Sequence, residues 1–481
     1  MAPSKTHFSR ILWIHLELHI TLTRRGHLGD EIYRQLRAQI VDGRLPAATR
    51  LPSSRELADR LEVSRNIVIA AFDRLIAEGF ATGRVGAGTY VAEVASGLAR
   101  RAPPGHELAP RAIWRAHIVT EQPRTDVTYD LRIGAPDPRL FPWDTWRGLV
   151  ANQLRGRRRR FHADPAGAPV LRSAIARHVG ASRSVVAGAE DLVVTSGAQQ
   201  ALDLVARVLV EPGATVAIEE PGYAEARTIF QLAGARVVPV PVDREGIEVS
   251  RIPSEARLVY VTPSHQFPLG VVMSLQRRLA LLAWAAQHRA AIVEDDYDSE
   301  FRFSGRPLEP LQSLDRAGRV LYIGTFSKVL LPTLRLGFVV APASVIPALK
   351  AAKRLTDSYG PPELQHALAE MIDDGTFARH LRKLIRIYRE RRDVLVAAVE
   401  AQLGDRIEVW PAQAGLHVAG HLRDRRSDVR AIQRRALAAG VAIHTLAPYY
   451  LRRARPGLAF GYGMLEARQV GEAIRRLAAV L

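Results

Sequence analysis

Residues 291–298 read Ala-Ile-Val-Glu-Asp-Asp-Tyr-Asp, a short apolar run that ends in a cluster of acids. Similar apolar runs of strand length occur at Leu192–Thr195, Val216–Ile218, Arg257–Thr262 and Val320–Gly324. Amphipathic segments such as Leu275–Gln287 lie between some of these runs. The alternation predicts an α/β fold, in which helices cover a mostly parallel sheet. We expect residues 127–481 to form this domain, with a smaller α+β lobe at about 346–481.

Composition excludes several classes of protein. The chain of 481 residues has no cysteine, which excludes disulfides and thiolate metal sites and fits a reducing cytoplasm. Its apolar runs are shorter than the roughly 20 residues of a membrane span, and polar residues interrupt the stretch 11–20, so neither a membrane helix nor a signal peptide is expected. The net charge of +18 fits a polyanionic partner, although arginine is abundant throughout the chain. We expect no metal site.

Residues 27–92 are predicted to form a separate small unit. A first helix carries an apolar stripe and ends at Gly43. Ser53 has the spacing of a capping box at the start of a second helix, and Ser64 is expected to cap a third, which runs to about Glu78. Two short strands, near Phe80–Thr82 and Thr89–Val91, follow as a hairpin. Residues 93–126, rich in Pro, Gly and charge, are interpreted as a linker.

Helix, tight turn, helix and hairpin together are typical of a winged helix-turn-helix. Arg65 and Asn66 begin the third helix, where side chains reach base edges, and arginine pairs with guanine as asparagine pairs with adenine. The expected DNA contacts from position are Ser53, Ser64, Arg65, Asn66, Arg84 and Gly88. A small helical domain with exposed arginines and no DNA is the alternative.

Segments of the large domain carry groups that suit one ligand. Thr195–Gln200 joins a strand to a helix, so its amides and helix dipole form an anion seat. Asp295 follows a strand and can hold a protonated ring nitrogen, while Tyr297 projects from the same face. Lys328 follows the next strand and can form an imine with an aldehyde. Arg335 can bind a phosphate.

Each of these segments alone has an ordinary explanation. Lys328 could be a surface lysine, Asp295-Asp296 a magnesium site, Thr195–Gln200 a helix cap and Tyr223 a core aromatic. Together they describe a ligand with a phosphate, a ring nitrogen, a phenolic oxygen and an aldehyde. That combination predicts pyridoxal 5′-phosphate as cofactor.

The amino-acid sequence of the small unit resembles that of the GntR family of winged helix-turn-helix regulators. The resemblance rests on Leu51-Pro52-Ser53-Ser54-Arg55-Glu56-Leu57-Ala58, Val63-Ser64-Arg65-Asn66 and Gly86-Ala87-Gly88-Thr89-Tyr90-Val91. It implies that Arg55, Arg65 and Asn66 are the leading DNA contacts. Ile69 departs from the family, since many members have a second basic residue at that point of the recognition helix.

The large domain resembles the fold-type I aminotransferases, and the whole chain resembles the MocR subfamily of GntR regulators. The matching segments include Asp164–Gly167, Val194–Leu202, Glu220–Tyr223, Pro263–Pro268, Glu294–Phe301 and Thr325–Lys328. The resemblance implies that Lys328 forms the Schiff base with pyridoxal phosphate, Asp295 pairs with the pyridine nitrogen, Tyr297 bonds the phenolic oxygen and Tyr223 stacks on the ring. The residues implied around the phosphate are Ala198, Gln199, Thr325, Ser327 and Arg335.

A few further residues concern the effector. Ala168 and Leu269 differ from the tyrosine and the small hydroxyl residue common in relatives, which would alter the amine that fits. Arg455, with Arg452 and Arg453 as rivals, is the candidate for binding an effector carboxylate, as the resemblance implies.

The combination favours a cytoplasmic transcriptional regulator. It would sense pyridoxal phosphate, or an amine that condenses with it, and bind operator DNA as a homodimer. The alternative is a working aminotransferase with an autoregulatory DNA-binding head. A structural or adaptor protein that binds neither ligand is the remote third possibility.

Overall fold

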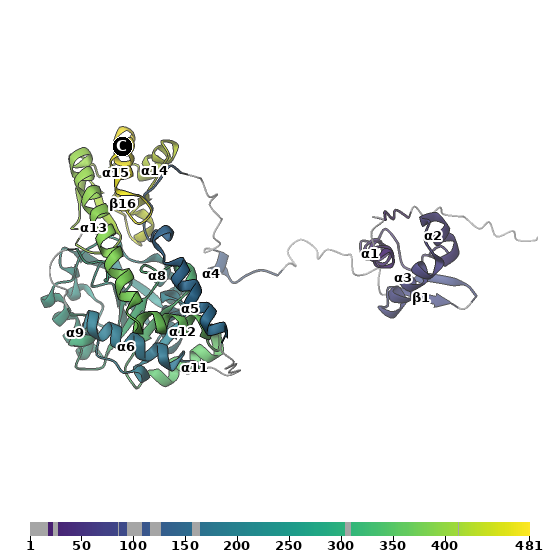
Figure 1. Ribbon diagram of the computed structural model, residues 1–481, viewed down its shortest axis with the longest axis horizontal. Helices are drawn as coiled ribbons and strands as arrows, with labels where there is room; N and C mark the ends of the chain where they lie inside the picture. Colours follow the sequence, from purple (N-terminus) through teal and green to yellow (C-terminus); the bar gives the residue numbers. More distant parts are fainter. Residues whose placement is uncertain are drawn as a thin grey trace, which may run out of the picture. The chain divides into compact units, whose positions relative to one another are not determined.

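The computed structural model describes residues 18–22, 27–84, 86–93, 108–115, 127–155, 164–303, 309–411 and 413–481. The chain divides into two compact units, Met1–Val119 and Thr120–Leu481 (Figure 1). Of the expected linker, residues 94–107 and 116–126 lie outside the described residues. No helix in the described part of the chain is both long and apolar enough to cross a membrane.

The first unit is a three-helix core with a hairpin. Its elements are α1 (Leu28–Val41), α2 (Ser54–Leu61), α3 (Arg65–Ala77), the antiparallel pair β1 (Ala81–Arg84) and β2 (Gly88–Val91), and the short α4 (Ala112–Arg115). Ile32, Leu36 and Leu75 are fully buried, as the apolar stripe requires. Ser53 Oγ accepts a hydrogen bond from the Glu56 N–H at 3.1 Å, which confirms the predicted cap.

The predicted cap at Ser64 is wrong in one respect. Ser64 occupies the N-cap position of α3, but its side chain makes no capping hydrogen bond. The N–H of Ile67 donates instead to the Ser64 backbone carbonyl at 3.1 Å. The exposed hydroxyl of Ser64 is therefore not used to hold the helix.

The second unit contains an eight-stranded sheet in the order β4-β11-β10-β9-β8-β5-β6-β7. Its strands are β4 (Leu192–Thr195), β5 (Thr215–Glu220), β6 (Arg236–Asp243), β7 (Gly246–Ile247), β8 (Ala256–Val261), β9 (Ala291–Asp296), β10 (Val320–Thr325) and β11 (Gly337–Val340). Strands β6, β5, β8, β9 and β10 pair in parallel, whereas β11 and β7 are antiparallel to their neighbours. A mostly parallel sheet is as the sequence predicted.

Helices cover this sheet. They are α5 (Trp143–Arg155), α6 (Pro169–Arg183), α7 (Ala198–Leu209), α8 (Ala224–Leu232), α9 (Leu275–His288), α10 (Leu311–Leu314), α11 (Ile346–Thr356) and α12 (Pro362–Asp373). Short 3-10 turns lie at Pro138–Leu140, Ala189–Asp191, Val249–Arg251, Pro332–Leu334 and Ala447–Tyr449. Apolar side chains fill the layers on both sides of the strands, as continuous apolar strand sequences require.

The C-terminal lobe is a smaller α+β layer. Its antiparallel sheet has the order β12 (Ile407–Val409), β13 (His417–Leu422), β16 (Gly457–Gly461), β15 (His444–Thr445), and α13 (Thr376–Leu403), α14 (Val429–Ala438) and α15 (Ala467–Val480) belong to the same region. In Figure 1 the long α13 runs from the helices around the large sheet to α14 and α15. An early segment joins this lobe, because β3 (Tyr129–Asp130) pairs in parallel with β14 (Val441–Ala442).

Topology brings the candidate site residues to one edge of the large sheet. Strands β9 and β10 are parallel neighbours, so the residues that follow Asp296 and Thr325 leave the sheet side by side. Strand β4 is separated from β10 by the antiparallel β11 and therefore runs in the same direction as β10. The turns after β4, β9 and β10 thus meet at the carboxyl ends of the strands, where α/β sheets bind ligands.

Candidate functional site

A cavity of about 210 Å³ lies at this edge. Every residue predicted to bind the cofactor lines it: Ala198, Gln199, Tyr223, Asp295, Tyr297, Thr325, Ser327, Lys328 and Arg335. These residues come from separate turns and helix ends of the second unit. Their convergence is a property of the fold.

Lys328 is held at the wall of the cavity. Its Nζ donates a hydrogen bond to the Gly134 carbonyl at 2.6 Å. Burial lowers the pKa of the Lys328 amine, and the carboxylates of Asp298 and Asp295 oppose that shift. A lysine with a lowered pKa has more of the free amine that reacts with an aldehyde.

Asp295 offers an unsatisfied acceptor. One carboxylate oxygen, Oδ2, accepts a hydrogen bond from the Tyr260 hydroxyl at 2.8 Å, whereas Oδ1 is buried and has no partner among the described residues. Burial raises the pKa of Asp295 to about 7. A buried acceptor without a donor costs free energy, so a ligand with an N–H at this place would be stabilised.

The other end of the cavity is built for an anion. Gly197, with φ of +80°, caps the N-terminus of α7, where free backbone amides and the helix dipole attract negative charge. Arg335 has a left-handed backbone with φ of +52°, and its Nη2 donates to the Ser196 carbonyl at 2.6 Å. The Thr325 hydroxyl donates to Ser327 Oγ at 2.9 Å. A guanidinium, two hydroxyls and a helix N-terminus together suit a phosphate.

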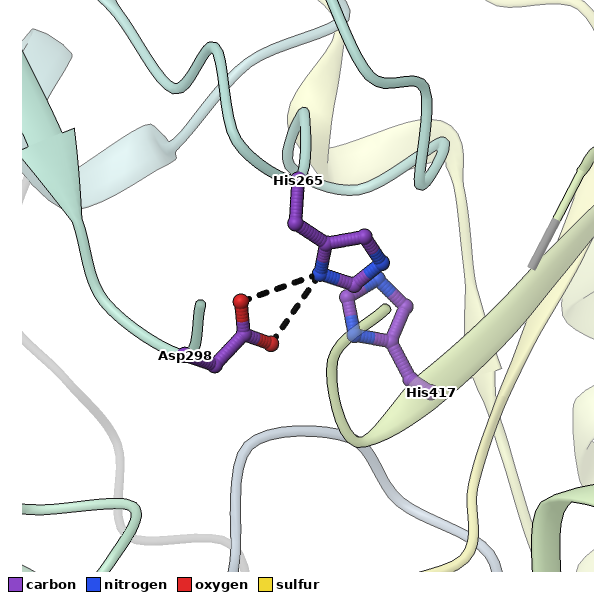
Figure 2. Close-up of side chains that lie close together, drawn as sticks. All are labelled: His265, Asp298 and His417. Atoms are coloured by element: carbon purple, nitrogen blue, oxygen red, sulfur yellow. Dashed lines mark hydrogen bonds and ion pairs between the residues drawn. The ribbon is translucent and has the colours of Figure 1, made fainter. Parts of the chain in front are cut away.

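Figure 2 shows a cluster of His265, Asp298 and His417, and Tyr297 contacts it through His265. The Tyr297 hydroxyl lies 2.9 Å from His265 Nδ1, and the same nitrogen lies 3.0 and 3.1 Å from the two oxygens of Asp298. The His417 ring lies 4.8 Å from that of His265, between centroids, and its Nε2 lies 3.0 Å from the Pro268 carbonyl.

Three side chains of this cluster have the proximity of metal ligands, since atoms of His265, Asp298 and His417 lie within 4.8 Å of one another. However, His265 Nδ1 faces Asp298, and His417 Nε2 faces a carbonyl oxygen. The contacts of these side chains therefore form a hydrogen-bonded network. Sequence reasoning assigned no role to these residues: His265 lies in the quoted segment Pro263–Pro268, but no signal singles out His417, which the lobe supplies.

Aromatic side chains close the cavity. Tyr223 meets Phe267 edge to face at 5.5 Å between ring centroids, and Phe267 meets Tyr297 in the same way at 5.9 Å.

Ala168 and Leu269, the two positions at which the sequence departs from its relatives, lie elsewhere. Ala168 is buried, and its N–H donates to Gln365, while Leu269 is buried in an apolar cluster. Neither is among the residues that line the cavity.

Arg455 does not reach this site, contrary to the expectation. Its Nη2 donates to Glu408 Oε2 at 2.8 Å, and Glu408 belongs to β12. Arg452 and Arg453 do not line the cavity either. Within the described lining, the guanidinium is that of Arg335, at the end suited to a phosphate.

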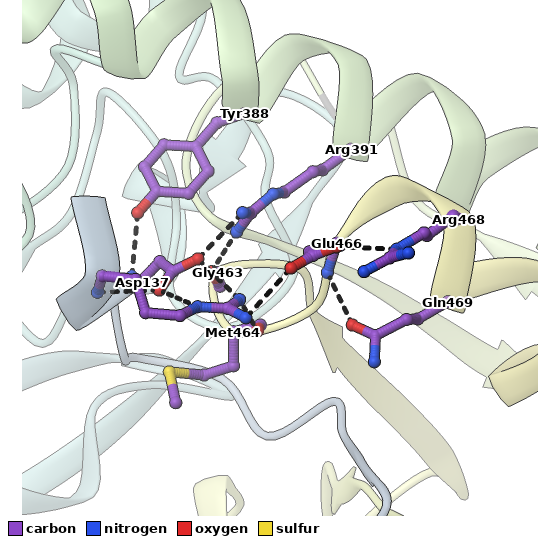
Figure 3. Close-up of polar contacts among 9 residues, drawn as sticks. Asp137, Tyr388, Arg391, Gly463, Met464, Glu466, Arg468 and Gln469 are labelled. Atoms are coloured by element: carbon purple, nitrogen blue, oxygen red, sulfur yellow. Dashed lines mark hydrogen bonds and ion pairs between the residues drawn. The ribbon is translucent and has the colours of Figure 1, made fainter.

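The segment before α5 is fixed by a buried ion-pair network (Figure 3). Asp137 accepts from Arg391 Nη2 at 2.8 Å and from Arg139 Nε at 2.9 Å, and its backbone N–H donates to the Tyr388 hydroxyl at 2.9 Å. Arg391 also donates to the Gly463 carbonyl. This network anchors the segment in which Gly134 bonds Lys328.

The predicted DNA contacts lie in the first unit, and all are exposed: Ser53, Arg55, Ser64, Arg65, Asn66, Arg84 and Gly88. Arg65 Nε donates to Ser54 Oγ at 3.2 Å, which brings the N-terminal ends of α2 and α3 together. In the hairpin, the Arg84 guanidinium lies 4.9 Å from the centre of the Tyr90 ring. The exposed start of α3 therefore presents Arg65 and Asn66 in the manner of a recognition helix.

Comparison with known families agrees with this division. Residues 133–458 match the model of aminotransferase class I and II, and residues 28–91 match that of bacterial regulatory proteins of the gntR family. The chain is therefore a transcriptional regulator in which a GntR-type DNA-binding domain precedes an aminotransferase-like domain.

Within that class it belongs to the MocR regulators. It is 40% identical over 457 residues to the probable rhizopine catabolism regulatory protein MocR of Rhizobium meliloti. The matched region covers 93% of this chain and 92% of the relative. It is 33% identical over 439 residues to the pyridoxine biosynthesis regulator PdxR of Corynebacterium glutamicum, covering 90% and 91% of the two chains. Among solved structures it resembles kynurenine aminotransferase of Pyrococcus horikoshii, with a TM-score of 0.71, 27% identity and coverage of 76% and 95%.

Proposed function

We propose that pyridoxal 5′-phosphate binds in the cavity and that its presence, or that of an amine condensed with it, controls operator binding. The observation that carries this proposal is Asp295 Oδ1, a buried acceptor on the cavity wall without a donor. A protonated pyridine nitrogen supplies the missing donor. The anion seat at α7 and the amine of Lys328 suit the phosphate and the aldehyde of the same molecule.

The residues that line the cavity would contact different parts of the cofactor. Arg335, Ala198, Gln199, Thr325 and Ser327 would surround the phosphate, Tyr297 would bond the phenolic oxygen, and Tyr223 would cover a face of the ring. When bound, the cofactor supplies an electrophilic aldehyde carbon. Lys328 presents its amine there, the Gly134 carbonyl orients Nζ, and the aromatic walls reduce access of water.

Control of DNA binding requires the two units to communicate. Residues 93–126 join them in the chain, and we propose that this linker, most of which lies outside the described residues, carries the coupling. We also propose a two-fold dimer, because paired half-sites on an operator require two DNA-binding units. Exposed Trp143 and Leu154 on α5 offer apolar surface for such a contact. A regulator of this kind would act in the cytoplasm, with the chromosome.

The test has two measurements. Protein loaded with pyridoxal phosphate is reduced with borohydride, and the attachment site is read by mass spectrometry of peptides. We expect the added mass on Lys328 in the wild type, its loss in Lys328→Ala and its retention in Lys383→Ala, which alters an exposed lysine of α13. Attachment that is unchanged in Lys328→Ala would refute the assignment.

The second measurement addresses function. Binding of the full chain to its own upstream DNA is titrated with and without pyridoxal phosphate. A shift in DNA affinity in the wild type that Lys328→Ala abolishes would support a sensor. An unchanged DNA affinity together with robust steady-state transamination would favour the aminotransferase alternative instead.

A further inference from the structure

We propose that the effector is a primary amine without a carboxylate, and that it carries a hydroxyl or similar hydrogen-bond donor which His417 Nδ1 accepts. This inference rests on the proposed function, since the amine is taken to react at the aldehyde held beside Lys328. It names the chemical class of effector, which neither the fold nor the family assigns. Three features of the cavity carry it.

The first feature is the distribution of cations. Among the described residues that line the cavity, the permanently charged or readily charged basic groups are Arg335 and Lys328. Arg335 bonds the Ser196 carbonyl at the anion seat, so a phosphate bound there would engage it. Lys328 is the amine that an effector displaces. No described lining arginine therefore remains to pair with a carboxylate, and Arg455 is already paired with Glu408 at 2.8 Å.

The second feature is the excess of acid near Lys328. The carboxylates of Asp298, Asp295 and Glu225 all act on the Lys328 amine. Asp298 lines the cavity and is 1% exposed, so its charge is weakly screened by water. A carboxylate brought to the same place would be repelled, whereas an incoming ammonium would be attracted.

The third feature is an unused acceptor on His417. The His417 side chain is buried, with 3% exposure, yet it lines the cavity. Its Nε2 lies 3.0 Å from the Pro268 carbonyl, which can only accept, so Nε2 carries the proton. The lone pair of the neutral ring is then on Nδ1, to which no described group donates. Burial lowers the pKa of His417 well below its ordinary value, which keeps the ring neutral.

These features place an acceptor and a carboxylate near the reacting lysine. In Figure 2 the His417 and His265 rings lie side by side and Asp298 faces them. An effector hydroxyl near its amine can donate to Nδ1, whereas a methyl group leaves that lone pair unpaired and a carboxylate brings a second acceptor. In this exchange the effector nitrogen replaces the Lys328 nitrogen at one carbon, and all the hydrogens that the incoming ammonium loses pass to the lysine nitrogen, which leaves as an ammonium.

The test compares small amines of similar size on the full chain loaded with pyridoxal phosphate. Ethanolamine carries a hydroxyl, n-propylamine a methyl and glycine a carboxylate. Each is titrated at equal free-amine concentration, and the change in visible absorbance gives an apparent Kd. We expect ethanolamine to bind about 2- to 10-fold more tightly than n-propylamine, the range of one net hydrogen bond, and at least about 10-fold more tightly than glycine.

A variant assigns the preference to His417. His417→Phe keeps a flat ring but removes the acceptor, so the ratio of ethanolamine to n-propylamine affinity should fall to about 1. His421→Phe is the matched control, because His421 lies on the same strand, β13, bonds Trp410 and Tyr450, and does not line the cavity. Its ratio should equal that of the wild type.

The outcomes separate this inference from the function on which it rests. Glycine binding as tightly as ethanolamine to the wild type would overturn the inference even if His417→Phe does not fold. A hydroxyl preference that survives in folded His417→Phe would also overturn it. Absence of the cofactor absorbance before any amine is added would refute the proposed function itself.

Discussion

Asp295→Asn should weaken the binding of pyridoxal phosphate by a predictable amount. The substitution keeps the shape of the side chain and removes its negative charge. Asp295 is 4% exposed and its Oδ1 has no described partner, so water cannot replace the lost interaction with a protonated ring nitrogen. A hydrogen bond to a charged group contributes about 1.5–3 kcal/mol. At about 1.4 kcal/mol for each factor of ten, Kd should rise about 10- to 150-fold.

The pH dependence gives this prediction a second readout. Because burial raises the pKa of Asp295 to about 7, the carboxyl is largely protonated below that pH and cannot pair with a charged pyridine nitrogen. Wild-type affinity should therefore increase as pH rises through about 7. Asp295→Asn should lose this step and keep only the increase that comes from deprotonation of Lys328.

The assay is a titration with pyridoxal phosphate followed by visible absorbance between pH 6 and pH 8.5. Glu219→Gln is the matched control, because Glu219 is also a buried carboxyl with a pKa raised to about 7, but it does not line the cavity. Its side chain accepts from Thr262 at 2.6 Å, which glutamine can still do. An Asp295→Asn affinity within twofold of the wild type, or an equal loss in Glu219→Gln, would refute the assigned role of Asp295.

Three other predictions concern the Asp137 network, operator binding and the pH dependence of stability. Asp137→Ala leaves the buried Arg391 charge unpaired and should destabilise the large unit by about 3–5 kcal/mol in calorimetry, whereas Arg139→Ala, which removes a half-exposed partner, should cost less than about 1 kcal/mol. Arg65→Ala should weaken specific operator binding by about 1–3 kcal/mol in a footprint titration. The raised pKa of Glu219 means that the folded state holds a proton which the unfolded state has lost, so this group makes the fold less stable as pH rises from about 4.5 to about 7. Glu219→Gln should reduce that decline in the melting temperature.

Each of these predictions can fail clearly. Equal losses for Asp137→Ala and Arg139→Ala would show that burial of the Asp137–Arg391 pair does not determine its contribution. An unchanged footprint for Arg65→Ala on the true operator would exclude Arg65 from base recognition. Identical pH profiles of melting in the wild type and Glu219→Gln would show that Glu219 titrates alike in the folded and unfolded chain.

The sequence predicted the groups that follow strand ends, because local pattern determines them. Lys328, Asp295 and the turn at Thr195–Gln200 each follow an apolar run, and parallel pairing brings the ends of such runs together. Position relative to a strand therefore identified Lys328, Asp295 and the turn before α7, and the family resemblance added Tyr223, Thr325 and Ser327.

Groups contributed by tertiary neighbours could not be found in this way. Tyr260 reaches Asp295 from within β8, and His417 comes from the lobe, more than eighty residues beyond Lys328. Arg455 was assigned to a carboxylate by the family resemblance, as an arginine in the C-terminal part of the chain. Its pairing with Glu408 depends on an antiparallel sheet whose register the sequence pattern does not give.

The hydrogen bond from Lys328 to Gly134 connects the cavity to the backbone that leads toward the DNA-binding unit. Residues 131–134 are clamped between the lobe and the lysine: the Gly461 N–H donates to the Leu131 carbonyl at 2.7 Å, and Lys328 Nζ donates to Gly134 at 2.6 Å. Any ligand that forms a bond with Lys328 Nζ must break the hydrogen bond between Nζ and the Gly134 carbonyl. The backbone at Leu131–Ala135 should therefore be held less firmly when a ligand is bound to Lys328. Faster amide hydrogen exchange in this segment would then report that the cavity is occupied.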